Sequence, residues 1–351
     1  MDYQYDSLKY VGNISQIGGI KRYKMIEGLA KNLEVIEVNN GSGLIFTILP
    51  DKCLDIFNLS FKGNPISYIS PAGLVSPLYY DSRDNGWLKT FGGGLFVTCG
   101  LTNVGEPCNF EGTDYGLHGN ISQIPADEVN LSQQLIGEEF VFEVSGKIRQ
   151  VKTLVENIVI DRKISSRLFN NEIRVIDTIT NQGATRRPFM ILYHMNFGYP
   201  LVNPESEFIV PIESTVGYDE HAEKRKVKCL EIPQPVNSYV EETYIHNVHS
   251  KNNRSGFCII NNKHNPEYGV SVTYPTDVLH HLGQNNCFRE KDYFVAFEPC
   301  NNEIKGAEYE NGKGTLRYLE PAESIRIELI IKFNTNTQNL KETINIINRS
   351  E

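Results

Sequence analysis

Alternation between hydrophobic and polar residues is the main pattern in the first part of the chain. Residues 33–38 and 43–49 alternate on either side of an Asn-Gly step, and such a pair of runs predicts a β-hairpin. Residues 54–61 alternate again, and after a short turn the run 66–69 predicts one more strand. We therefore expect an antiparallel meander in this part of the chain.

Strand-like runs return after residue 140 and follow one another at short intervals, which is typical of a sandwich or a barrel. The runs are 140–144, 146–151, 157–164, 172–180, 256–260, 269–274, 293–298 and 324–331. A helical pattern is convincing only at about 337–348, where Leu340, Ile344 and Ile347 share one face. Because no linker-like tract and no exact repeat divides the chain, we expect a single β domain over residues 1–351.

The segment 70–124 differs from its surroundings in composition: it has many glycines and interleaved aromatic residues, which include the single tryptophan, Trp87. A long irregular segment inside a compact domain is usually either functional or disordered. The many apolar side chains argue against disorder. We interpret the segment as one wall of a binding groove, since aromatic faces and a glycine-permitted backbone suit a polyhydroxylated ring.

Residues 188–193 are apolar at nearly every position, which predicts a strand that is buried on both faces or lines a packed groove. His194 follows this run, and Gly198 and Pro200 come next as breakers, so we expect the imidazole where the strand opens into a loop. For an isolated histidine in this position, a core residue hydrogen-bonded to a carbonyl is the ordinary interpretation.

Composition narrows the classes of function. The 351 residues are 40% hydrophobic, enough for a large core, and the formal net charge of -9 argues against a nucleic-acid partner. The densest basic run, 224–228, is expected to be a solvated loop or an edge strand. No apolar stretch is long enough to cross a bilayer, and the acidic residues 1–6 do not resemble a secretory signal.

The seven cysteines are odd in number and never occur as Cys-x-x-Cys, which excludes a zinc ribbon and disfavours a disulfide framework. A reduced, cytoplasmic protein with unbridged thiols is the simplest expectation.

Three short stretches could carry chemistry, and each lies beside a Gly or a Pro. They contain His118, His194 with Asn196, and Glu298. Two imidazoles and one carboxylate that converge on a pocket would supply a general acid and a general base near neutral pH. The alternatives are a turn role for His118 and a simple ion pair for Glu298.

These stretches together resemble the galactose mutarotase (aldose 1-epimerase) superfamily, in particular its DUF4432-type branch of aldose 1-epimerase-like proteins. The superfamily has a Leu-His-Gly turn, a later His followed by an Asn-containing aromatic stretch, and a C-terminal Glu. Here these features correspond to His118, to His194 with Asn196, and to Glu298. Further stretches similar to the branch are 18–23, 51–56, 86–94 and 99–105, so the resemblance covers about residues 10–330.

The resemblance implies a large antiparallel β-supersandwich and an enzyme that interconverts the two anomers of a free sugar. It implies that Glu298 takes the proton from the anomeric hydroxyl, that His194 protonates the ring oxygen, and that His118 orients a hydroxyl. Neither a metal nor an organic cofactor is required for such proton transfer. A non-catalytic sugar-binding protein, or a sugar isomerase or lyase on the same fold, stays open as an alternative.

Other residues are weaker candidates for substrate contact. Lys52 stands where the branch usually has Arg. The ammonium group of Lys keeps the positive charge but cannot make the planar, two-pronged contact of a guanidinium. Asp277 and Gln284 are expected to border the pocket, in a loop before the Glu298 strand, and Trp87 to line it. The pairs His246 and His249, and His280 and His281, could suggest metal ligands, but neither pair has a third ligand at a spacing typical of a metal site, so we expect surface or structural roles for them. The position of His280 and His281 at the border of the pocket stays open as an alternative.

Overall fold

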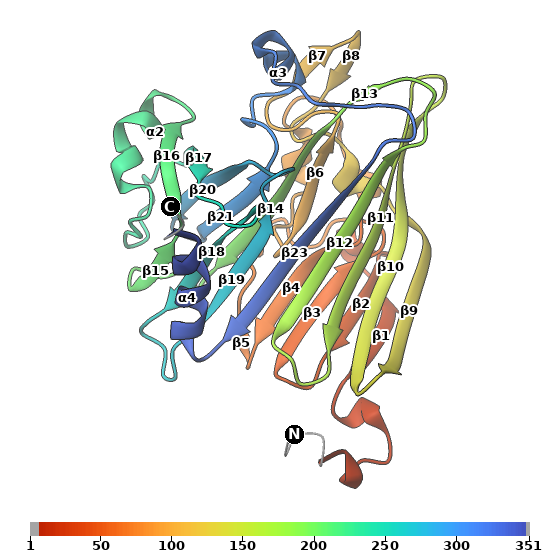
Figure 1. Ribbon diagram of the computed structural model, residues 1–351, viewed down its shortest axis with the longest axis vertical. Helices are drawn as coiled ribbons and strands as arrows, with labels where there is room; N and C mark the ends of the chain where they lie inside the picture. The colour runs from red at the N-terminus through yellow and green to blue at the C-terminus, as the bar shows by residue number, and fades with distance from the viewer. Residues whose placement is uncertain (1–6, 349–351) are drawn as a thin grey trace.

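The computed structural model describes residues 7–348, which form three main antiparallel sheets (Figure 1). The first is five-stranded, in the order β1-β2-β3-β4-β5. Its strands are β1 (Gly19–Lys24), β2 (Glu34–Asn39), β3 (Leu44–Leu49), β4 (Asp55–Phe61) and β5 (Asn64–Pro65). The predicted hairpin is confirmed, because Ile36 pairs with Ile48. The strand predicted at 66–69 is wrong, since these residues make only isolated bridges such as that of Ser67 to Phe197.

The second sheet has eight strands, in the order β15-β18-β19-β23-β12-β11-β10-β9. They are β9 (Ala126–Ile136), β10 (Glu139–Lys152), β11 (Glu156–Arg167), β12 (Glu172–Asn181), β15 (Ser206–Ile209), β18 (Arg254–Asn261), β19 (Tyr268–Pro275) and β23 (Ser324–Asn334). The two runs predicted before and after residue 145 are one continuous strand, β10.

The third sheet has six strands, in the order β16-β17-β20-β21-β14-β6. They are β6 (Val97–Leu101), β14 (Met190–Gly198), β16 (Ile212–Gly217), β17 (Glu242–Val248), β20 (His281–Arg289) and β21 (Asp292–Cys300). Strands hold 50% of the residues and helices 13%, and this antiparallel architecture confirms the expected all-β supersandwich.

Short elements complete the chain. Two small strand pairs are β7 (Cys108–Phe110) with β8 (Thr113–Tyr115), and β13 (Arg187–Pro188) with β22 (Tyr318–Leu319). The 3-10 helices are η1 (Ser7–Tyr10), η2 (Ile14–Gln16), η3 (Gly28–Ala30), η4 (Pro77–Tyr79), η5 (Gly86–Lys89), η6 (Ile121–Gln123) and η7 (Lys226–Lys228). The α-helices are α2 (Glu220–Arg225), α3 (Ala307–Lys313) and α4 (Thr337–Asn348).

The helices bring one confirmation and one correction. The predicted C-terminal helix is α4, which buries Leu340, Ile344 and Ile347 beside Cys258 and Ile260 of β18. The basic run 224–228 is helical rather than a loop or an edge strand. Asp219 caps α2 by accepting a hydrogen bond from the Ala222 amide, and α2 has acidic residues in its first turn and basic residues in its last.

Residues 1–6, which we expected not to be a secretory signal, lie outside the described residues. Among the described residues, no helix is long and apolar enough to span a membrane. The seven cysteines are free thiols, in agreement with the unbridged state expected, and Cys108 is the one that is not buried.

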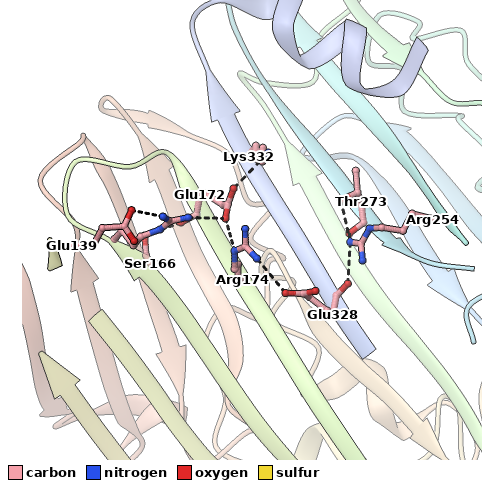
Figure 2. Close-up of polar contacts among 9 residues, drawn as sticks. Glu139, Ser166, Glu172, Arg174, Arg254, Thr273, Glu328 and Lys332 are labelled. Atoms are coloured by element: carbon pink, nitrogen blue, oxygen red, sulfur yellow. Dashed lines mark hydrogen bonds and ion pairs between the residues drawn. The ribbon is translucent and has the colours of Figure 1, made fainter. Parts of the chain in front are cut away.

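The eight-stranded sheet has one polar face and one buried face. Along β12, half-buried and buried residues alternate without interruption. On the polar face, Figure 2 shows a row of charged side chains in which Arg174 contacts Glu172 and Glu328, while Lys332 also reaches Glu172. These contacts are partly solvated, so each contributes little to stability.

The buried faces of all three sheets meet in one hydrophobic core. Phe61 of the five-stranded sheet packs on Phe333 of β23, with ring centroids 5.8 Å apart. Phe257 of β18 packs on Phe297 of β21, with centroids 4.6 Å apart. The core therefore lies between the eight-stranded sheet on one side and the other two sheets on the other.

A buried ionic network also joins the three sheets. Arg162 of β11 donates to Asp177 of β12 at 2.8 and 2.6 Å and to Asp55 of β4 at 2.8 Å. Tyr193 of β14 donates its hydroxyl to Asp177 at 2.7 Å, and Thr98 of β6 donates its amide and hydroxyl to Asp55. The arginine side chain has no exposed surface, so each carboxylate oxygen depends on protein donors.

We expect Arg162→Met to lower the free energy of unfolding by about 3–5 kcal/mol, because it leaves two buried carboxylates without their cation. Urea denaturation measures this change. Arg167→Met is the matched control on the same strand: Arg167 pairs with Glu139 near the surface and should contribute below about 1 kcal/mol. Equal effects of the two substitutions would contradict the role given to the buried network.

Candidate functional site

The site centres on two side chains from neighbouring strands. In the register of β14 and β21, Leu192 faces Cys300 and Met195 faces Phe297, which sets His194 beside Glu298. His194 Nε2 lies 3.2 Å from Glu298 Oε1, and the two side chains are only 8% and 3% exposed. His194 is in the middle of β14 and not at its end, because the strand continues to Gly198. Our expectation of a strand-to-loop junction was wrong on this point.

The space for the Glu298 carboxylate depends on a glycine in the next strand. Gly283 of β20 pairs with Glu298, and a Cβ atom built on it would lie 2.9 Å from Glu298 Oε2 and 2.7 Å from Ile304 Cδ1. Both distances are shorter than a normal contact. A side chain at position 283 would therefore displace either the carboxylate or Ile304.

Aromatic rings support the imidazoles. Trp87 stacks on Phe91 with centroids 4.4 Å apart and also contacts the rings of His118 (4.9 Å) and His194 (6.1 Å). Its indole nitrogen donates to Ser122 at 3.1 Å, and the residue is only 2% exposed. Trp87 therefore lies behind the two histidines and restricts their orientation.

His118 comes from the turn after β8 and lies edge-on to His194, with ring centroids 5.7 Å apart. The amide of Gly105 donates to His118 Nδ1 at 3.3 Å, so in the neutral ring the proton is on Nε2. His118 has a φ of 58° and Gly119 a φ of 69°. A Cβ atom on Gly119 would meet the Gly100 carbonyl at 2.3 Å, so only glycine fits there.

Burial changes the charge of the site. It raises the pKa of Glu298 to about 8, and the negative charge of Glu241 acts in the same direction. Burial lowers the pKa of His194 to about 3, with a smaller contribution from His118, while Asn196 opposes the fall. Burial also lowers the pKa of His118 to about 4. At pH 7, Glu298 is therefore a neutral carboxylic acid beside a neutral imidazole, and the pair shares one transferable proton.

These residues lie in a cleft of about 1050 Å³. Trp87, His118, His194 and Glu298 all line it, together with about a dozen other polar side chains, which include Glu241, Asn285, Arg289 and Asp292. One wall consists of residues from the glycine-rich segment, between Ser70 and His118, as the sequence pattern predicted for a groove wall.

The other predicted contact residues lie elsewhere. The Lys52 ammonium is 3.0 Å from the Thr90 carbonyl and 3.2 Å from Gln123 Oε1, in a separate small cavity. Asn196 is fully buried and donates to the carbonyls of Gly94 and His194.

Gln284 is in strand β20, not in a loop, and is fully buried, with its Oε1 atom 2.9 Å from His246 Nε2. Asp277 is exposed in a turn and does not line the cleft.

The remaining histidines have local partners. His249 pairs with Glu213 at 3.0 Å. The rings of His280 and His281 pack edge-on at 4.5 Å, and neither ring lines the cleft, so the alternative position at its border is wrong. Within residues 7–348, no group of three or more His, Cys, Asp or Glu side chains has an arrangement that could hold a metal ion.

Several cleft residues were missed from the sequence. Asp292 and Phe294 of β21 lie on the Glu298 face of that strand, and a period of two counted back from Glu298 would have found them. Glu241 and Asn285 belong to a region whose strands, β17 and β20, were not predicted. Strand β20 contains Gly, Gln and two Asn residues, which have low β-propensity.

Known structures share this fold. A candidate aldose 1-epimerase from Klebsiella pneumoniae superposes with a TM-score of 0.89 at 18% identity, covering 96% of this chain and 91% of that one. A galactose mutarotase-like protein from Clostridium acetobutylicum superposes with a TM-score of 0.64 at 13% identity, covering 91% and 99%. The chain therefore has the fold of the galactose mutarotase-like superfamily, as the sequence motifs predicted.

The family follows from the sequence match. Residues 30–333 match the model of the "Domain of unknown function (DUF4432)", and the chain belongs to this DUF4432 family. Among curated protein sequences, none matches this one.

We expect Glu298 to be protonated at pH 7 and to ionise near pH 8. Infrared difference spectroscopy on the intact protein can follow its carboxylic acid band, with Glu298→Gln to assign the signal. Glu241→Gln should lower this pKa, because it removes a neighbouring negative charge. A carboxylate band for Glu298 at pH 6 would contradict the description of the pair.

Proposed function

We propose that this protein is a carbohydrate-active enzyme of the aldose 1-epimerase type, which interconverts the anomers of a free sugar. The observation that carries the proposal is the contact of 3.2 Å between His194 Nε2 and Glu298 Oε1, inside a cleft with room for a sugar. Anomer exchange needs one group that takes a proton and one that gives a proton. This pair holds one proton that either member can carry.

In the proposed reaction, Glu298 as carboxylate takes the proton of the anomeric hydroxyl while His194 as imidazolium gives a proton to the ring oxygen. The bond between C1 and the ring oxygen breaks, and C1 becomes an aldehyde carbon. Rotation about the C1–C2 bond presents the other face of the carbonyl. The ring closes when the hydroxyl formed from the ring oxygen attacks C1 and returns its proton to His194, while Glu298 protonates the carbonyl oxygen.

The electrostatics of the cleft support this sequence of steps. After ring opening, Glu298 is neutral and His194 is neutral, and burial favours this state of the pair. The charged state that opens the ring contains the same number of protons. A sugar hydroxyl that donates to Glu298 and a ring oxygen that accepts from His194 both favour that charged state. Desolvation thus favours the proton on Glu298, whereas the bound sugar favours it on His194. These opposing effects allow the proton to move in both directions.

His118 has a supporting role in this proposal. With its Nδ1 occupied by the Gly105 amide, its Nε2–H is left as a fixed donor for a sugar hydroxyl. The aromatic rings of Trp87 and Phe91 hold both imidazoles in place.

Substitution of the pair tests the function. Glu298→Gln and His194→Asn should each lower kcat by about 10²–10⁴-fold with little change in sugar affinity, since each removes one proton transfer. The double variant should be little worse than either single one, because the two groups act in the same step. His118→Asn should affect KM more than kcat. Magnetisation-transfer NMR of anomeric protons across a panel of free sugars measures the rates.

Glu290→Gln and His249→Asn are matched controls outside the cleft and should retain full activity. If Glu298→Gln interconverts anomers at the wild-type rate, the assignment is wrong. A wild-type protein that binds sugars but exchanges no anomers would favour a non-catalytic sugar-binding protein.

The pH profile is a second test. The reaction requires that Glu298 and His194 together carry one transferable proton. We therefore expect kcat/KM to be constant between about pH 4 and pH 8. It should fall above about pH 8, where Glu298 loses that proton, and below about pH 3, where His194 gains a second one. Rates must be corrected for uncatalysed mutarotation at each pH. A rise in kcat/KM through pH 8–9 would be inconsistent with this proton count.

A further inference from the structure

The cleft extends well beyond the acid/base pair. On β21, Glu298, Phe294 and Asp292 point to the same face, and all three line the cleft. Asp292 is six positions before Glu298, which corresponds to about 20 Å along a strand. The volume of about 1050 Å³ is at the upper end of the ~300–1000 Å³ that holds a drug-sized ligand. A single sugar ring at Glu298 would leave most of this length free.

The neighbouring strands continue the floor of the cleft in the same direction. The register pairs Asn285 of β20 with Ala296, Cys287 with Phe294, and Arg289 with Asp292. Strand β17 lies beside β20 in the sheet (Figure 1). Thr243 of β17, and Glu241 just before this strand, also line the cleft.

A rigid wall faces this floor. Tyr68 stacks on Phe294 with ring centroids 4.3 Å apart, and its hydroxyl donates to Asp292 at 2.8 Å. Its backbone is held by hydrogen bonds to Asn196 and Gly94. The wall continues through Ser70 to Ala72, which also line the cleft. The far end is therefore built from paired strands and stacked rings.

The charged groups at this end have no ionic partners in the described part of the chain. Glu241 accepts a hydrogen bond from Asn285 at 2.6 Å and forms no ion pair, and Arg289 reaches only the Tyr239 carbonyl, at 3.5 Å. Glu241 and Asp292 outnumber Arg289, so the field disfavours phosphate and other anions. Carboxylates, an amide and a guanidinium beside an aromatic edge suit the hydroxyls and the C–H face of a neutral sugar ring.

We propose that Tyr68, Glu241, Asn285, Arg289 and Asp292 form a distal subsite for a second sugar ring. The substrate is then a reducing disaccharide or a longer oligosaccharide. Its reducing ring lies at His194 and Glu298, and the next ring occupies the distal subsite. This inference rests on the proposed function for the chemistry at the reducing ring, and it adds the class of substrate.

Matched sugars test the distal subsite in the wild-type protein. Glucose is compared with maltose and cellobiose, galactose with a 1,4-linked galactobiose, and mannose with a 1,4-linked mannobiose, by anomeric NMR. For the preferred reducing ring, the disaccharide should have a kcat/KM at least about tenfold higher, mainly through KM, which corresponds to about 1.4 kcal/mol. If every monosaccharide that is turned over matches or exceeds its disaccharides, the distal subsite does not exist.

Variants locate the effect. Asp292→Asn keeps an acceptor for the Tyr68 hydroxyl and should reduce the ratio of disaccharide to monosaccharide kcat/KM several-fold, whereas Glu290→Gln, outside the cleft, should leave the ratio unchanged. An unchanged ratio in a folded Asp292→Asn protein would overturn the assignment. If the wild-type protein exchanges no anomers, the proposed function fails. Calorimetry then still tests the subsite, because the disaccharide must bind more tightly than its monosaccharide.

Discussion

The buried Arg162 network is the constraint on which the site depends. Arg162 binds a carboxylate in its own sheet and another in the five-stranded sheet, and Tyr193 adds the six-stranded sheet. Successive residues of a strand point to opposite faces, so the hydroxyl that binds Asp177 fixes the backbone that carries His194 on the other face. The position of the proposed acid is thus tied to an ionic contact inside the core. Cross-strand pairing then sets the distance from His194 to Glu298.

Desolvation of His194 and Glu298 is the second determinant of the site, because it sets their protonation state. A carboxyl group and an imidazole that are almost fully buried both prefer their neutral forms, and within residues 7–348 neither forms an ion pair with a lysine or an arginine that would oppose this. The loss of water therefore holds the pair in a state with one mobile proton. The proposed chemistry relies on this state and on the absence of a side chain at Gly283, which leaves room for the carboxylate.

Much of the fold could be predicted from the sequence, because strands such as β12 bury one face and alternate strictly. Strand β20 was not recognised, since Gln284 and its neighbours are polar yet buried through partners such as His246 that are distant in sequence. His194, Glu298 and His118 were selected through their motifs, and the structure brings them together. Lys52 belongs to another of the motif stretches but lies outside the cleft, because a motif does not specify the direction of a side chain. Asp277 was predicted only from its position before the Glu298 strand, and it also lies outside the cleft.

The division of the cleft between a paired-strand floor and an irregular wall has a consequence for sequence divergence. His194 and Glu298 are carried by strands whose hydrogen-bond register leaves little freedom, whereas the wall between Ser70 and His118 has few register constraints. Amino-acid substitutions in that wall can therefore change the shape of the ligand pocket without moving His194 or Glu298. Two proteins of this fold that share a TM-score of 0.89 at 18% identity can therefore keep a common framework while their ligand ranges separate.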